Sequence, residues 1–341
     1  MKLLKAKNLI EKHLVLSCFL VLILKTGISP IGREYIAWLR NATEYFPTPI
    51  NFLHSSVIPI LLMKVLHNFS DFVWWGLGSV IYLFWIIFTL NLLKRKYKDS
   101  YVPAALIFLS TTPVTCSLTM VGNVDIWTLI GCSIMVLGEF KFALILGSLF
   151  CVGGNADQSI AISLVLAIYS LSGSRTSLKI MKIYTPFAVG SYLMLRFFVG
   201  KSPIQSIHEL LFANLTPIIR NSLGMWHLEL YSLMSACWIP WIYFVWLRIE
   251  SNRKRFFVGV SVVVIPFLLI FAVLDGTRVG TTVGFLTLSL SFVDFGKFDK
   301  LGLAHFKRYR IYIPLVFFFL PTVLVGNGPL LRLPYLKLIL H

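Results

Sequence analysis

An acid and an arginine interrupt a long apolar stretch of this sequence. The apolar run that starts near Phe256 breaks at residues 273–279, where Asp275 and Arg278 stand three positions apart. Charged side chains at hydrocarbon depth cost free energy, so they usually face a bundle interior or an aqueous cavity. The guanidinium of arginine is planar, stays charged and suits phosphate. We therefore expect Arg278 to bind phosphate oxygens, with Asp275 orienting it or acting as a general base. The alternative is a local ion pair that closes the ends of two helices.

Two further short polar breaks are similar to this one. Residues 122–125 are Gly-Asn-Val-Asp and residues 153–157 are Gly-Gly-Asn-Ala-Asp, so Asp125 and Asp157 each open an apolar helix. Capping and the helix macrodipole favour aspartate at a helix start. This structural role alone is enough to explain the presence of either aspartate. In the functional interpretation, both face one cavity and bind sugar hydroxyls of a substrate. Their separation is not typical of metal ligands, so no metal site is predicted.

The first long polar loop carries four more candidates. Arg33, Glu34 and Arg40 follow the first apolar run, and His54 precedes a proline. We interpret the arginines as contacts to phosphate and sugar, and Glu34 and His54 as candidate acid–base residues. The alternatives are an ordinary solvated loop and a structural histidine.

Three charged residues in the second half of the chain complete the set. Arg196 and Arg220 are candidate phosphate contacts, although Arg196 could simply extend outward to the membrane interface. Glu229 lies about a turn inside an apolar run, so we expect it to be buried with a partner.

The composition is typical of a membrane protein. The chain of 341 residues is 57% hydrophobic and 13% charged, and its mean hydropathy is +0.81. A soluble domain is typically about 25% charged. We predict a single integral-membrane domain over residues 1–341, because no polar linker divides the chain. The net charge of +17 lies in short clusters between apolar runs, which indicates topology signals and not a nucleic-acid-binding face.

No cofactor is predicted. The five cysteines lie in apolar runs without metal-like spacing. Nucleotide-binding and hydrolase fingerprints are missing from the sequence, so energy would come from an ion gradient or an activated lipid substrate.

Hydropathy predicts an all-α fold with about eleven transmembrane helices. The expected spans are residues 14–30, 72–93, 102–121, 125–138, 142–153, 157–172, 183–199, 226–247, 256–274, 280–295 and 311–326. Residues 31–71 and 200–225 form long external loops, and residues 50–67 within the first predict an interfacial helix. About two thirds of Lys and Arg fall on the other set of loops, which places the N-terminus in the cytoplasm and the C-terminus outside.

The layout resembles bacterial surface-polysaccharide membrane enzymes. These are O-antigen and capsule polymerases of the Wzy type and, more distantly, GT-C-like glycosyltransferases. The resemblance is carried by the first external loop from Gly32 to Pro59, by residues 122–125 and by residues 275–278. GT-C enzymes typically carry an acidic residue in that loop; the matching position here is Glu34, where the commoner residue is aspartate.

The resemblance implies glycosyl transfer at the periplasmic face of a bacterial inner membrane. An oligosaccharide chain on undecaprenyl pyrophosphate passes to a hydroxyl of an incoming lipid-linked repeat unit, which builds O-antigen of lipopolysaccharide or capsule. The implied partners are this lipid-linked oligosaccharide and the lipid bilayer, with a chain-length regulator as a further candidate, and no nucleic acid.

Two alternatives stay open. A flippase for the same lipid-linked glycan would show repeated halves and charges along a path to both faces. A membrane acyltransferase that modifies surface glycans would need a histidine deep in the membrane. The unusual charges favour the outer face and no internal repeat is evident, so polymerisation is the preferred hypothesis.

Overall fold

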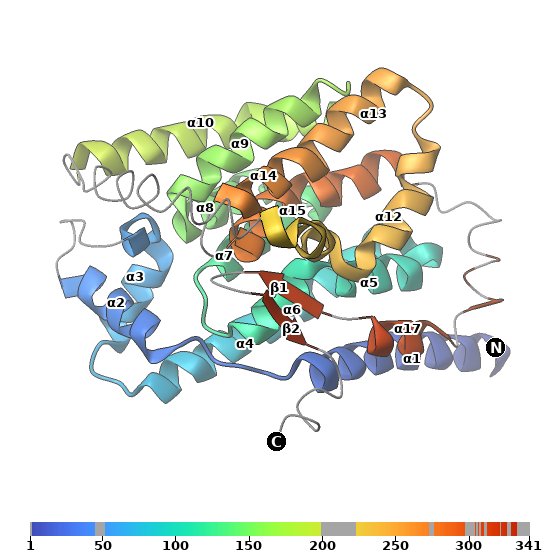
Figure 1. Ribbon diagram of the computed structural model, residues 1–341, viewed down its shortest axis with the longest axis horizontal. Helices are drawn as coiled ribbons and strands as arrows, with labels where there is room; N and C mark the ends of the chain where they lie inside the picture. The colour runs from blue at the N-terminus through green and yellow to red at the C-terminus, as the bar shows by residue number, and fades with distance from the viewer. Residues whose placement is uncertain are drawn as a thin grey trace.

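The computed structural model is a bundle of helices with one short β-hairpin among the residues it describes (Figure 1). It describes residues 2–44, 52–198, 223–272 and 276–296, and near the C-terminus residues 304, 306, 308, 309, 312–320, 322–325 and 329–332. The predicted all-α class is therefore confirmed for the bulk of the described chain. The hairpin, in which β1 (Thr322–Val325) pairs antiparallel with β2 (Pro329–Arg332), was not expected.

The first part of the chain contains long and short helices. In order they are α1 (Lys2–Thr26), α2 (Arg33–Glu44), the 3₁₀ turn η1 (Phe52–Ser55), α3 (Val57–Leu66), α4 (Asp71–Tyr97), η2 (Lys98–Ser100), α5 (Tyr101–Leu109), α6 (Thr112–Thr119), α7 (Asp125–Leu137), α8 (Ala143–Gly154), α9 (Ala156–Ser170) and α10 (Arg175–Phe198).

The second part begins with a helical stretch at residues 223–234. It continues through η3 (Ser235–Cys237), α12 (Trp238–Phe244), η4 (Trp246–Arg248), α13 (Asn252–Gly259), the π-helical turn η5 (Val260–Val264), α14 (Ile265–Ala272), α15 (Gly276–Phe295) and α17 (Ile313–Phe319).

Two helical segments, Asp71–Leu109 and Leu223–Arg248, are long and apolar enough to cross a membrane. Several helices between them, including α7, α8 and α9, are apolar but shorter. At this level the structure is consistent with the membrane protein that the composition predicts.

Several of the predicted spans are not continuous α-helices. Within residues 226–247, η3 interrupts the helix, and Ser235 there has φ +50°. Residues 102–121 divide into α5 and α6, because Pro113 lacks an N–H and disfavours helical backbone before it. The hydroxyls of Ser110 and Thr111 donate back to the carbonyls of Ile107 and Phe108, each at 2.7 Å, and satisfy the end of α5. The predicted span 311–326 is also wrong: α17 is followed by strand β1.

Glycines allow two pairs of helices to approach closely. A Cβ on Gly131 of α7 would lie 2.5 Å from the carbonyl oxygen of Gly147 in α8. A Cβ on Gly280 of α15 would lie 2.6 Å from the carbonyl oxygen of Pro266 in α14. Small residues at such contacts are typical of helix packing in membranes, where close backbone approach replaces the hydrophobic effect. These contacts fix α7 and α15, two of the helices that begin at predicted polar breaks.

A small apolar core joins the first loop to the 122–124 turn. Ile36, Leu53 and Trp74 pack there with Val124, all of them buried. The indole N–H of Trp74 donates to the carbonyl of Gly122 at 3.1 Å. Gly122 has φ +96°, a backbone conformation that favours glycine. The turn that precedes α7 is thus held against α4 and the first loop.

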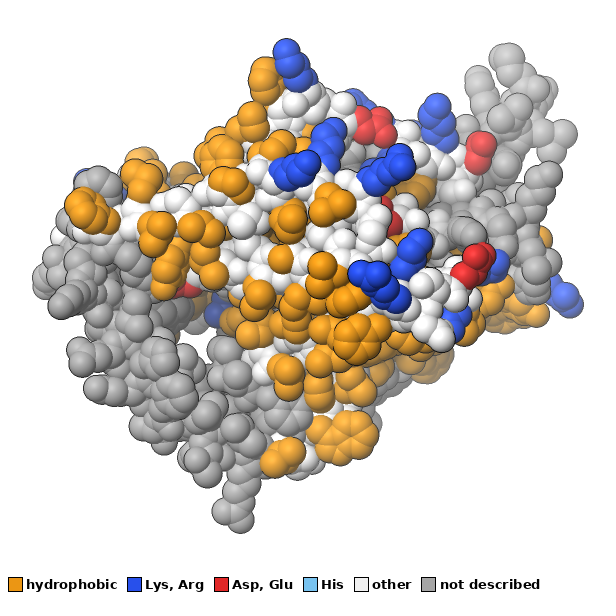
Figure 2. Space-filling view, turned by 90° about the horizontal axis from the view of Figure 1, so that it is seen from above, with side chains coloured by type: hydrophobic (Ala, Val, Ile, Leu, Met, Phe, Trp, Pro, Cys, Tyr) orange, Lys and Arg blue, Asp and Glu red, His pale blue; other side chains and the backbone are white. Residues whose placement is uncertain are grey.

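The described surface is divided by chemistry. Figure 2 shows Lys and Arg side chains gathered over one part of the visible face, beside broad hydrophobic areas. In Figure 1, α2 and α3 lie at the opposite end of the molecule from the N-terminus of α1. The first-loop helices and the N-terminal end of α1 are therefore far apart in the molecule.

Candidate functional site

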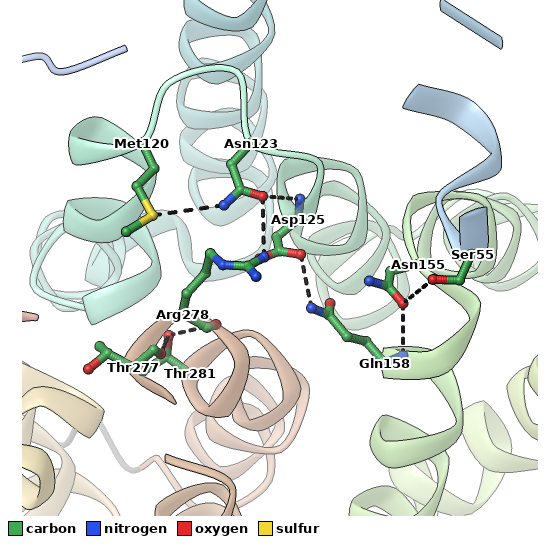
Figure 3. A network of polar contacts seen from close by, with 9 residues as sticks. All are labelled: Ser55, Met120, Asn123, Asp125, Asn155, Gln158, Thr277, Arg278 and Thr281. Carbon is green, nitrogen blue, oxygen red and sulfur yellow. Dashed lines mark hydrogen bonds and ion pairs between the residues drawn. The ribbon is translucent and has the colours of Figure 1, made fainter. Parts of the chain in front are cut away.

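A buried ion pair joins the starts of α7 and α15. The guanidinium of Arg278 binds the carboxylate of Asp125, and these side chains are 11% and 5% exposed (Figure 3). Asp125 is the first residue of α7, where the positive end of the helix dipole favours a negative charge. Neither charge is stable in an apolar bundle without such a partner. Two of the predicted polar breaks therefore meet through their charged side chains.

The turn before α7 adds a second polar contact to Arg278. The Asn123 side-chain oxygen accepts the backbone N–H of Asp125 at 3.0 Å and an N–H of Arg278 at 3.4 Å. Its amide nitrogen faces the sulfur of Met120 at 3.9 Å. Asn123 therefore fixes the backbone of the turn and the position of the guanidinium together.

The third polar break contributes through residues that the sequence prediction did not select. Gln158 of α9 donates to the second oxygen of Asp125 at 2.9 Å. The Asn155 side chain caps α9 by accepting the Gln158 backbone N–H at 3.0 Å. Ser55 of η1 then donates to the same Asn155 oxygen at 3.3 Å. Asp157, predicted to bind substrate, lies half-buried in the first turn of α9 between the two residues that form this network.

The start of α15 is also tied to the helical stretch at 223–234. The hydroxyls of Thr277 and Ser232 lie 3.0 Å apart, and the Ser232 hydroxyl lies 2.8 Å from the carbonyl of Glu229, to which it donates. Thr112 of α6 donates to the Ser232 carbonyl at 2.6 Å. Glu229 is fully buried, as its place in the apolar run predicted. Arg278 is thus positioned from both sides, by α7 with α9 and by the 223–234 helix with α6.

The arginines of the first loop form a separate cluster. Arg40 binds Asp71 at 2.8 Å and the Phe69 carbonyl at 3.0 Å, while Arg33 approaches Asp71 at 3.8 Å and is 76% exposed. Glu34 is exposed on α2. Among the described contacts, none links this cluster to Arg278, and the small apolar core lies beside it. The single site expected from the sequence is therefore resolved into a buried network and a surface cluster.

Asp71 is the member of the surface cluster that the sequence analysis did not select. A signal for it exists, because it is an acid at the start of the longest apolar helix, after a loop rich in arginine. Its carboxylate is favoured there by the helix dipole.

Four predicted site residues cannot be compared with the structure. Asp275 and Arg220 lie outside the described residues. His54 and Arg196 belong to η1 and α10, but their side chains are outside the description. His54 is adjacent in sequence to Ser55, which brings its backbone to the edge of the network.

A small cavity lies against the ion pair. Water can occupy about 20 Å³ of it. Its walls include Tyr82, Asn123, Asp125, Arg278, Thr281 and Thr282. Roughly 10–15 Å³ suffices for one water, so the cavity is of water size and polar on one side. Within the described part of the chain, no three His, Cys, Asp or Glu side chains come together to hold a metal.

The comparisons with known proteins give no family. The chain matches no family model, and neither curated proteins nor solved structures show a significant similarity to it.

Proposed function

We propose that this protein is a membrane glycosyltransferase that polymerises undecaprenyl-pyrophosphate-linked oligosaccharide repeat units at the periplasmic face of a bacterial inner membrane. The observation that supports it most is the buried Arg278–Asp125 pair at the meeting point of the predicted polar breaks. Ionisable side chains inside an apolar bundle are rare and usually functional. An arginine held charged at such a point suits a diphosphate leaving group.

The contacts suggest distinct roles for the two charges. In the proposed reaction, an acceptor hydroxyl attacks the anomeric carbon, and the bond from that carbon to the diphosphate oxygen breaks. The electron pair leaves with undecaprenyl diphosphate, whose growing charge Arg278 stabilises. The two Asp125 oxygens already accept hydrogen bonds from Arg278 and Gln158, so Asp125 positions the arginine rather than removing the proton. Glu34, His54 and Asp275 remain the candidate bases.

Substrate binding requires the site to open. The cavity beside the pair has room for water and not for a diphosphate. Arg278 is nevertheless slightly exposed, and the network around it is built from helix starts and turns, which move more easily than helix interiors. We expect the lipid-linked substrate to enter at this end and to replace water around the guanidinium.

The proposed placement in the membrane uses about eleven spans, some of them short or broken. The N-terminus is cytoplasmic and the C-terminus periplasmic. The gathering of Lys and Arg on one part of the surface supports this orientation (Figure 2).

A flippase for the same lipid-linked glycan is the second candidate. One observation favours it: α15 carries Arg278 near its start and Asp294 near its end, and Asp294 accepts hydrogen bonds from Tyr169 and Ser174. Polar groups at both ends of one helix are what a path to both faces requires.

The test is a deletion strain of the source bacterium, complemented with variants and examined for surface glycan. Polymerisation predicts that the deletion leaves single repeats capped on the lipid carrier, and that Arg278→Ala does the same. A flippase predicts that units fail to reach the outer surface. Membrane levels of each variant are measured by immunoblot.

Arg95→Ala is the matched control, because Arg95 is an exposed arginine in the last turn of α4, far along the chain from the network. It should keep the normal ladder of chain lengths. A normal ladder from Arg278→Ala at normal membrane level would remove Arg278 from the mechanism.

A further inference from the structure

An apolar groove opens between helices α5, α12 and α17. It has a volume of about 240 Å³, and its walls include Leu106, Ile107, Ile239, Tyr243, Val316 and Phe317. This volume is much larger than that of the cavity beside Arg278. Polar atoms contribute almost nothing to the walls, so the groove suits a hydrocarbon chain and not a sugar.

The groove faces outward from the bundle. Ile239 is 63% exposed and Val316 is 44% exposed, although both belong to strongly apolar helices. Such side chains are stable when lipid covers them. Leaving this apolar surface in water costs free energy, which favours an apolar occupant.

One arginine lies beside the groove, and a second is close in sequence to a residue that lines it. The guanidinium of Arg248 lies 5.8 Å from the ring centre of Tyr243, which lines it. Arg308 is exposed and follows the lining residue Phe306 by two positions. The occupant that matches both features has an apolar chain and a negatively charged head.

We propose that the groove holds one acyl chain of an anionic phospholipid, whose phosphate lies beside Arg248 and Arg308. The lipid belongs to the leaflet at the basic end of the bundle, where α12 ends in Arg248 through η4. Figure 1 shows α5, α12 and α17 away from the end that carries α2 and α3. Arg278 and Asp125 belong to other helices, at the starts of α15 and α7, so the groove is separate from the buried ion pair. The proposal concerns this groove alone and does not depend on the proposed transferase activity.

The test is native mass spectrometry of the purified full chain, titrated with phosphatidylglycerol or phosphatidylcholine of the same acyl chains. We expect one phosphatidylglycerol to stay bound in preference to phosphatidylcholine. Ile239→Trp fills the groove and should abolish this retention, while Ile242→Trp adds the same bulk to an exposed position of α12 that does not line it. Arg248→Gln should reduce the preference about fivefold, since a basic residue near an anionic lipid contributes about 1 kcal/mol.

Several outcomes would overturn the proposal. Equal retention by Ile239→Trp and Ile242→Trp would exclude the groove, and equal affinity for the two lipids would exclude the anionic head. Stronger binding of a polyprenyl phosphate than of phosphatidylglycerol would assign the groove to the lipid carrier instead. If Ile239→Trp does not fold, wild-type protein is photocrosslinked with phosphatidylglycerol that carries a diazirine on its chain. Crosslinks should map to α5, α12 or α17, and a map without them contradicts the site.

Discussion

Arg278 is paired with a carboxylate that lies far from it in sequence. Its partner Asp125 is 153 residues away, and Gln158 and Asn123 complete the hydrogen bonds around the pair. A buried charge that loses its partner is strongly destabilising, by about 3–5 kcal/mol, whereas removing both charges can be nearly neutral. The same pair could therefore serve stability, function or both, and a double-mutant cycle separates these roles.

We predict strong coupling between Asp125→Asn and Arg278→Gln. Each single substitution should lower the unfolding temperature of the purified protein by several degrees, because it leaves one buried ion without its partner. The double variant should recover most of this loss. Thermal unfolding in detergent measures the cycle, and additive losses would show that the two side chains do not stabilise each other.

The same double variant separates structure from function. Under the proposed mechanism, Arg278→Gln with Asp125→Asn restores stability but not long glycan chains, because no cation remains to stabilise the diphosphate. A ladder restored together with stability would make the pair a structural clamp. The glycan chain lengths of the double variant are measured in the same complemented deletion strain.

At the scale of elements, two glycine contacts pack the helices that carry the pair closely against their neighbours, α7 against α8 and α15 against α14. Gly131 lies within α7 against Gly147 of α8, and Gly280 lies within α15 against Pro266 of α14. The π-helical turn η5 frees a carbonyl at Ser261, and Thr287 of α15 donates to it at 3.2 Å. Turns of this type insert one residue and often occur at functional sites. The register of α15 therefore depends on α14 and η5 as well as on its own sequence.

Gly131→Ala should destabilise the protein, whereas Gly190→Ala should not. A Cβ at position 131 would meet the Gly147 oxygen at 2.5 Å and the Cys151 sulfur at 2.6 Å, so α7 and α8 must separate. Such overpacking typically costs about 1–3 kcal/mol. A Cβ at position 190 of α10 meets nothing within 4 Å and gains helix propensity of roughly 0.5–1 kcal/mol. Unfolding temperatures in detergent test this, and equal values for the two variants would contradict the close packing.

The whole molecule is asymmetric along its length. The first-loop helices α2 and α3 lie at one end, and the N-terminus of α1 lies at the other (Figure 1). The turn at Gly173 precedes α10, whose sequence begins with Arg175 and includes Lys179 and Lys182. A protein that follows the positive-inside rule keeps such a turn in the cytoplasm.

Reporter fusions should show opposite locations for Asn68 and Gly173. Alkaline phosphatase is active only outside the cytoplasm, so a fusion after Asn68, between α3 and α4, should be active and one after Gly173 inactive. A fluorescent protein that folds only in the cytoplasm should give the reverse pattern at each site. Activity at Gly173 without activity at Asn68 would invert the proposed orientation and place Arg278 and Asp125 toward the cytoplasm.

The sequence by itself determined the helical class, the membrane-like composition and the selection of the two charges that form the buried pair. These depend on local properties, since hydropathy and the rarity of ions in apolar runs are visible without knowing any contact. Arg278 and Asp125 were both selected on that basis. The burial of Glu229 followed from the same reasoning.

Only the tertiary structure decided which residues are partners. Asp125 lies distant in sequence from Arg278, yet helix packing through Gly131 and Gly280 positions the helices that carry them. Asp71, which the sequence analysis did not select, is the carboxylate that binds Arg33 and Arg40. Asn155 and Gln158 belong to the network because the start of α9 lies beside Ser55 and Asp125, a placement that hydropathy does not reveal. The break at residues 110–111 likewise depended on Pro113 and on hydroxyl–carbonyl hydrogen bonds that hydropathy does not include.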